Sequence, residues 1–134
     1  MTNVMLLSTL LLMTIAARGQ GNPAPPDLPV NIVNSTADKS KPLIIYISGD
    51  GGWNSFSQGF TKQLASSGYP VVSLNANKYF WKKKTPAQAA ADVTLLMNEY
   101  CRLWDRATVS IIGYSFGADV TPFVYNRLAP GVAA

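Results

Sequence analysis

The ten residues IIGYSFGADV, Ile111–Val120, hold two glycines at two-residue spacing on either side of Ser115. An apolar run precedes this stretch, and a segment that can form a helix follows it. A nucleophile elbow has this arrangement: a strand ends in a tight turn that carries the serine, and a helix begins at once. The turn strains the serine backbone, and only residues as small as Gly113 and Gly117 fit two positions away. The pattern alone is weak, because glycine and serine are common. With its strand and helix, it predicts a catalytic nucleophile rather than an ordinary connecting turn.

Strand patterns and helix patterns alternate along the chain from Pro42. The runs that predict buried strands are rich in apolar and β-branched residues, and they are PLIIYIS at 42–48, VVSLNA at 71–76 and ATVSIIGYS at 107–115. Three segments predict helices. The first carries Phe56, Phe60 and Leu64 and stops at Gly68, and the second runs from a capping box at Thr85–Gln88 to about Asp105. The third covers 118–128 and has Pro122 inside it. This alternation predicts an α/β fold in which a parallel sheet is flanked by helices.

Composition limits the function classes. At 134 residues the chain holds one domain at most. A net charge of +4 is far from the dense basic stripe of a nucleic-acid binder, so we expect no nucleic-acid partner. Cys101 is the only cysteine, which excludes an internal disulfide, and we expect it to be a small buried apolar residue.

The N-terminal residues have the features of an export signal. The apolar run at 4–17 is too short to span a bilayer but suits a signal peptide, and Ala17-Arg18-Gly19 forms a cleavage site before Gln20. The segment before the run lacks Lys and Arg, so an uncleaved anchor is the alternative. We predict a periplasmic protein with a signal peptide at 1–19, a Pro/Gly-rich linker with a possible edge strand (VNIVNST) at 20–41 and a folded domain at 42–134.

An ester hydrolase also needs two N–H donors for the oxyanion of the tetrahedral intermediate. The segment SGDGGW, Ser48–Trp53, follows the first predicted buried strand, and its glycines let the backbone approach a substrate. It lacks the lysine of a phosphate-binding P-loop and the spacing of a dinucleotide-binding turn. We expect the N–H of Asp50 or Gly51 to act together with that of Phe116. This chemistry needs no metal and no organic cofactor.

The chain contains no histidine. A serine without a neighbouring base keeps its proton and is a poor nucleophile. Asp50 and Asp119 are the substitutes that the sequence offers. Asp119 falls in the first turn of a predicted helix, where an exposed or capping carboxylate is the expected role. Asp50 is the stronger candidate because it lies in the predicted oxyanion loop.

The segment KYFWKKK, Lys78–Lys84, combines three aromatic residues with four lysines before a predicted helix. One interpretation is contact with an anionic membrane surface, with lysines at the headgroups and aromatic side chains at the interface. The alternative, which we favour at this point, is a solvated loop whose aromatic side chains pack under the neighbouring helix. Lysines do not attract a lysyl headgroup directly, so a role in binding such a headgroup is disfavoured.

Three long motifs resemble one family. YISGDGGW, YFWKKKTPAQAAAD and GYSFGADVTPFVYNRLAP, in this order between Pro42 and Pro130, resemble the VirJ family of bacterial virulence-associated periplasmic proteins, which includes the VirJ-like half of AcvB. The resemblance implies an α/β-hydrolase fold and a serine-hydrolase site at Ser115. It also implies hydrolysis of aminoacylated phosphatidylglycerol, chiefly the lysyl form, and an association with virulence and type IV secretion.

The resemblance also implies what the 134 residues lack. Family members carry further strands after the elbow helix, and the acid and histidine of the triad belong there in chain order. We therefore expect the N-terminal portion of such a domain, truncated after the elbow helix. The leading hypothesis is a VirJ-like serine hydrolase that in full-length form cleaves an aminoacyl-phospholipid ester. The alternatives are a non-catalytic periplasmic adaptor for secretion-system proteins and their substrates, or an inactive truncated copy.

Overall fold

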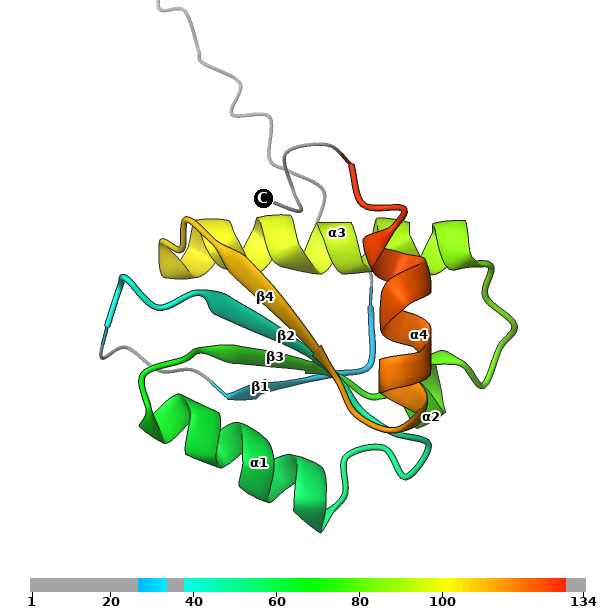
Figure 1. Ribbon diagram of the computed structural model, residues 1–134, viewed down its shortest axis with the longest axis horizontal. Coiled ribbons are helices and arrows are strands. Elements are labelled where there is room, and N and C mark those ends of the chain that lie inside the picture. The colour runs from blue at the N-terminus through cyan, green and yellow to red at the C-terminus, as the bar shows by residue number, and fades with distance from the viewer. Residues whose placement is uncertain (1–26, 34–37, 130–134) are drawn as a thin grey trace, which may run out of the picture.

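The computed structural model describes residues 27–33 and 38–129, and the predicted signal peptide at 1–19 lies outside them. Along the chain the elements are β1 (Val30–Val33), β2 (Leu43–Ile47), α1 (Ser55–Ser66), β3 (Val71–Leu74), α2 (Ala76–Tyr79), α3 (Pro86–Trp104), β4 (Val109–Gly113) and α4 (Phe116–Tyr125). The strands form one sheet, with α1 against one face and α3 and α4 against the other (Figure 1). The predicted α/β class, with a helix-covered sheet, is confirmed.

The strand order in the sheet is β1-β3-β2-β4. β2 pairs in parallel with both β3 and β4, as predicted, whereas β1 pairs antiparallel with β3. The sheet is therefore mostly parallel rather than wholly parallel. The reason is the connection at residues 34–42, which is shorter than the dozen or more residues that a parallel crossover needs.

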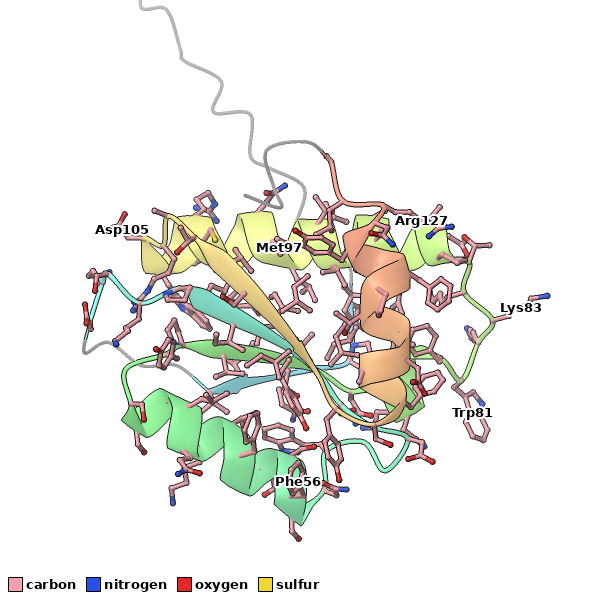
Figure 2. All side chains as sticks on the ribbon, in the orientation of Figure 1. Phe56, Trp81, Lys83, Met97, Asp105 and Arg127 are labelled. Carbon is pink, nitrogen blue, oxygen red and sulfur yellow. The ribbon has the colours of Figure 1, made fainter. Side chains whose placement is uncertain are left out.

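Two apolar clusters separate the faces of the sheet. On the larger face, β2 and β3 side chains pack against α3 and α4, and Met97 of α3 points into this core (Figure 2). The smaller face carries Ile44, Tyr46 and Val71, with Phe60 and Leu64 of α1 packed against them. All five residues of β2 are buried, as the continuous apolar run predicts for a strand covered on both faces.

Helix α3 begins as predicted. Thr85 caps it by accepting a hydrogen bond from the N–H of Gln88 at 3.1 Å, and the Gln88 side chain accepts one from the N–H of Thr85 at 2.9 Å. Pro86 takes the first helical position, where its missing N–H costs no hydrogen bond. The helix ends at Asp105, which adopts the left-handed conformation with φ 52°.

Helices α1 and α2 differ from the prediction. In α1 the buried residues are Ser57 and Thr61, while Phe56 of the predicted apolar stripe is 50% exposed. Ser57 is buried because its hydroxyl contacts the Tyr46 hydroxyl at 3.1 Å and donates to the carbonyl of Gly52 at 3.2 Å. The short helix α2 was not predicted at all.

The predicted third helix begins earlier than expected. Phe116, and not Ala118, is the first residue of α4, so the helix follows the serine directly. Pro122 lies inside α4, as expected.

Candidate active site

Ser115 lies in the short turn between β4, which ends at Gly113, and α4, which begins at Phe116. Its φ of 52° and ψ of −120° fall in a region that residues with a Cβ rarely adopt, which costs of the order of 1–3 kcal/mol. The N–H of Tyr114 donates to the carbonyl of Ile47 at 3.0 Å, which ties the turn to the end of β2. Ser115 is exposed, and its side chain does not cap the helix that follows. The turn therefore presents the hydroxyl to solvent instead of using it structurally.

The glycines on either side of Ser115 are required by close backbone contacts. A Cβ at Gly117 would lie 2.6 Å from the carbonyl oxygen of Ser48, and closer still to that of Ile47. A Cβ at Gly113 would lie 2.6 Å from the carbonyl carbon of Gly117 and would also overlap Thr121. Both obstacles include backbone atoms that no side-chain rotation can remove. The turn is thus packed as a nucleophile elbow requires.

The loop at 48–53 lies against this turn. A Cβ at Gly49 would lie 3.2 Å from the Cβ of Ser115 and 3.4 Å from the carbonyl oxygen of Tyr114. Sequence reasoning named Asp50 and Gly51 in this loop but not Gly49, which makes the closest approach. The only sequence signal for it is that it is the first glycine after the buried strand.

Helix α2 holds the loop at 48–53 in place. The N–H of Ala76 donates to the Ser48 hydroxyl at 2.9 Å, and the Asn77 side chain donates to the carbonyl of Asp50 at 2.8 Å. Gly52 has a φ of 65°, in the left-handed region that favours glycine, and a Cβ there would collide with Asn75. The loop is therefore fixed by hydrogen bonds from a helix that the sequence did not reveal.

Two of the three residues predicted as oxyanion donors line one pocket. Asp50 and Phe116 both line a pocket of about 270 Å³, together with Asn77, Phe80 and Trp81, whereas Gly51 and Ser115 are not among its lining residues. The N–H groups of Asp50, Gly51 and Phe116 make no hydrogen bond to any other described residue. Phe116 is the first residue of α4, where the helix dipole favours negative charge.

A second pocket adjoins the first. Its volume is about 240 Å³, and its lining is mainly apolar, with Phe80 and Phe116 shared between the two pockets. The rings of Phe80 and Phe116 meet edge to face with centroids 5.4 Å apart. The rest of the lining comes from the start of α3 and from α4, including Pro86, Ala89, Val120 and Phe123, and Lys84 stands at its border. The site thus offers one partly polar and one apolar compartment.

No described residue supplies an evident base. Asp119 is exposed in the first turn of α4, and Asp50 is exposed in the loop at 48–53. Asp92 is already engaged, since it accepts a hydrogen bond from the Tyr79 hydroxyl at 2.5 Å. Burial, followed by this hydrogen bond and the charge of Asp92, raises the pKa of Tyr79 above its usual range. Tyr79 therefore stays protonated and acts as a structural donor.

The described part of the chain has neither a metal-ligand cluster nor a membrane-spanning helix. No three of its His, Cys, Asp or Glu side chains gather closely enough to hold a metal ion. None of the helices in residues 27–33 and 38–129 has the length and apolar character that crossing a membrane requires.

The segment at 78–84 divides into a packed part and an exposed part. Tyr79 is only 4% exposed and Phe80 is half-buried, so these two rings pack under the neighbouring elements. Trp81 is 85% exposed, and with Lys83 it projects into solvent (Figure 2). The favoured prediction of packed aromatic side chains thus describes Tyr79 and Phe80 but not Trp81.

Comparison with known proteins identifies the family. The family model described as bacterial virulence protein (VirJ) matches residues 41–133. No curated protein matches the sequence. The matched segment covers most of the 134 residues and includes the elbow, the loop at 48–53 and the segment at 78–84. The chain therefore belongs to the VirJ family.

Proposed function

From this VirJ family membership, we propose that the chain carries the nucleophile and oxyanion hole of an exported ester hydrolase, with Ser115 as the nucleophile. The observation that carries the proposal is the backbone of Ser115, at φ 52° and ψ −120° between a strand and a helix. A strained, exposed serine whose hydroxyl serves no cap is hard to explain structurally. It is the geometry that an attacking hydroxyl needs.

The chemistry proceeds in two steps. The Ser115 hydroxyl attacks the ester carbonyl, and a base takes its proton. The oxyanion that forms accepts hydrogen bonds from the N–H groups of Phe116 and of Asp50 or Gly51. Collapse of the intermediate releases the alcohol, which receives the proton, and leaves an acyl group on Ser115. Water then attacks the acyl-enzyme, releasing the acid and restoring the hydroxyl.

The proposed substrate is an aminoacyl-phospholipid similar to lysyl-phosphatidylglycerol. The aminoacyl carbonyl would be the group attacked, so the acyl-enzyme would carry the amino acid. Two features of the site support an amphiphilic ester. The pocket lined by Asp50 and Asn77 offers polar groups, and the adjoining pocket offers an apolar surface for part of the lipid.

These 134 residues contain no histidine, so a histidine base would have to be supplied from outside them. The test uses an extended protein, in which this chain is joined to the further strands and the histidine that the family resemblance implies after the elbow helix. We expect it to release lysine from lysyl-phosphatidylglycerol in mixed micelles, and the 134-residue chain alone to show no release above background. In the extended protein, Ser115→Ala should lower the rate by several powers of ten, because the members of a triad act as a unit.

Ser110 provides the matched control. It is an exposed serine on β4, the strand that leads to Ser115, five residues before it. Ser110→Ala in the extended protein should leave the rate within about two-fold of the unsubstituted protein, since it lies outside the reacting groups. Hydrolysis that survives Ser115→Ala would show that another residue is the nucleophile.

A second candidate function is a non-catalytic adaptor that holds secretion-system proteins or their substrates. An intact histidine downstream of these residues would favour the enzyme, and its loss with the fold retained would favour the adaptor. An adaptor would tolerate Ser115→Ala without loss of secretion of a reporter substrate, whereas the esterase hypothesis requires a loss. Complementation of a deletion strain with each form distinguishes the two.

Export to the periplasm completes the proposal. Its support is the apolar run at 4–17 followed by Ala17-Arg18-Gly19. Mass spectrometry of periplasmic protein should find a mature N-terminus at Gln20. Recovery of the intact chain with Met1 from the inner-membrane fraction would contradict cleavage.

A further inference from the structure

The segment Lys78–Lys84, here called the basic–aromatic loop, has a feature that the proposed chemistry does not use. Trp81 is the most exposed large apolar side chain of the described residues, at 85%. Lys78, Lys82 and Lys83 are exposed around it. We propose that this loop docks the protein on an anionic phospholipid surface, with Trp81 at the level of the headgroups and the lysines on the phosphates.

The loop has a fixed base, so Trp81 is held outward. Tyr79 is anchored in the core by its hydrogen bond to Asp92, and its ring meets that of Phe80 edge to face at 4.7 Å. Phe80 in turn contacts Phe116. The Lys84 ammonium lies 5.0 Å from the centre of the Tyr79 ring, so this lysine makes a cation–π contact within the protein. The indole is thus presented on a packed support instead of lying on the surface.

The charge around the loop suits an anionic partner. From Ala76 to Ala91 the sequence has four lysines and no Asp or Glu. The next acidic residue, Asp92, faces Tyr79. On neighbouring elements the acidic side chains are Asp50 and Asp119. Their two negative charges are fewer than the four positive charges of the lysines. A lysine near an anionic membrane contributes about 1 kcal/mol of binding.

The apolar groups favour a membrane over a nucleic-acid duplex, whose phosphates supply most of its contacts to proteins. Phosphates alone would explain the lysines but not a tryptophan with two more partly exposed rings nearby. Phe116 is 38% exposed and Phe123 is 55% exposed, and both line the apolar pocket beside Phe80. Tryptophan and lysine together are suited to the lipid–water interface, where the ring contacts the acyl boundary and the ammonium stays hydrated.

Docking in this way would also orient the site. Trp81 and Phe80 line the pocket that holds Asp50 and Phe116, so the pocket would open toward the lipid surface. This orientation of the pocket rests on the proposed function, because it would bring an ester embedded in a membrane to Ser115. Binding to the membrane itself does not require Ser115.

Sedimentation with vesicles tests the proposal on the 134-residue chain. Vesicles of phosphatidylcholine alone are compared with vesicles that also contain phosphatidylglycerol. We expect binding only to the second kind, and weaker binding as salt is added. Lys82→Ala and Lys83→Ala should each reduce the partition coefficient about five-fold. Trp81→Ala should reduce it about ten-fold, because the indole no longer leaves water.

Controls separate this surface from charge or apolarity in general. Lys62→Ala and Leu103→Ala remove an exposed lysine of α1 and an exposed leucine of α3, and both should bind as the unsubstituted chain does. Ser115→Ala should also bind normally, so failure of the esterase proposal leaves this result intact. Equal binding to both kinds of vesicle, equal effects of the control substitutions, or tighter binding to double-stranded DNA than to vesicles would overturn the proposal.

Discussion

Gly49 lies directly against Ser115: a Cβ at Gly49 would be 3.2 Å from the Cβ of the serine. The two residues follow β2 and β4, which are adjacent and parallel, so their carboxyl ends meet at one edge of the sheet. In open parallel sheets, ligands bind outside this edge. The contact therefore places the glycine loop at 48–53 beside the strained Ser115.

The strain at Ser115 predicts an unusual effect on stability. Replacement by glycine removes the Cβ that disfavours φ 52° and ψ −120°, whereas alanine keeps it. We expect Ser115→Gly to be more stable than Ser115→Ala by roughly 1–2 kcal/mol, even though glycine usually destabilises. Urea unfolding of both variants measures the difference. Equal stability, or a more stable alanine variant, would show that the turn is not strained.

The two elbow glycines predict a destabilisation that depends on position. Gly117→Ala and Gly113→Ala place a Cβ against backbone atoms and should each cost roughly 3 kcal/mol or more. Gly59→Ala in α1 is the matched control, because a Cβ there meets nothing within 4 Å. It should stabilise the protein by about 0.5–1 kcal/mol, since alanine favours the helix. In thermal unfolding, Gly59→Ala should have a higher melting temperature than the unsubstituted chain, and Gly113→Ala and Gly117→Ala should each have a lower one.

Tyr79 predicts a loss of stability at alkaline pH. Burial and the contact with Asp92 raise its pKa in the folded state, so the folded chain holds the proton more tightly than the unfolded chain. The stabilisation is complete below the unfolded pKa of about 10 and falls as the pH rises above it. Tyr79→Phe should cost about 1–3 kcal/mol at neutral pH, because Asp92 loses its donor.

The alkaline decline should be shallower in Tyr79→Phe. It should not vanish, because burial also raises the pKa of Tyr46 and of Tyr100. Chemical unfolding at a series of pH values gives both curves. Parallel curves for the two proteins would contradict the assignment of the decline to Tyr79.

Strand β4 predicts self-association. Among the described residues it pairs only with β2, so its other edge is unpaired, and its sequence VSIIG carries no charge or proline. Such an edge is a template for another strand. We expect the 134-residue chain to associate, and Ser110→Lys, which puts a charge on an exposed position of β4, to shift it toward monomer. Light scattering after size exclusion measures this, and Ser66→Lys on α1 should have no effect.

Some features of the fold and of the candidate site could be predicted from local sequence patterns. The capping box at Thr85 and the strand–turn–helix at Ser115 depend on residues a few positions apart, so they could be predicted from the sequence. The polar buried face of α1, helix α2 and the contact of Gly49 could not. Ser57 is buried because Tyr46 and Gly52 bond its hydroxyl, and Gly49 meets Ser115 only through the pairing of β2 with β4. These contacts depend on how the folded segments meet, which a local sequence pattern does not reveal.

The position of a covalent adduct tests the role of Ser115 most directly. The extended protein is treated with a fluorophosphonate, which reacts with an activated serine by losing fluoride, and the modified peptide is found by mass spectrometry. We predict one phosphonyl group on Ser115, loss of lysyl-phosphatidylglycerol hydrolysis in proportion to labelling, and no label in Ser115→Ala. An adduct on another residue that tracks the loss of activity, or full activity with Ser115 labelled, would contradict the account.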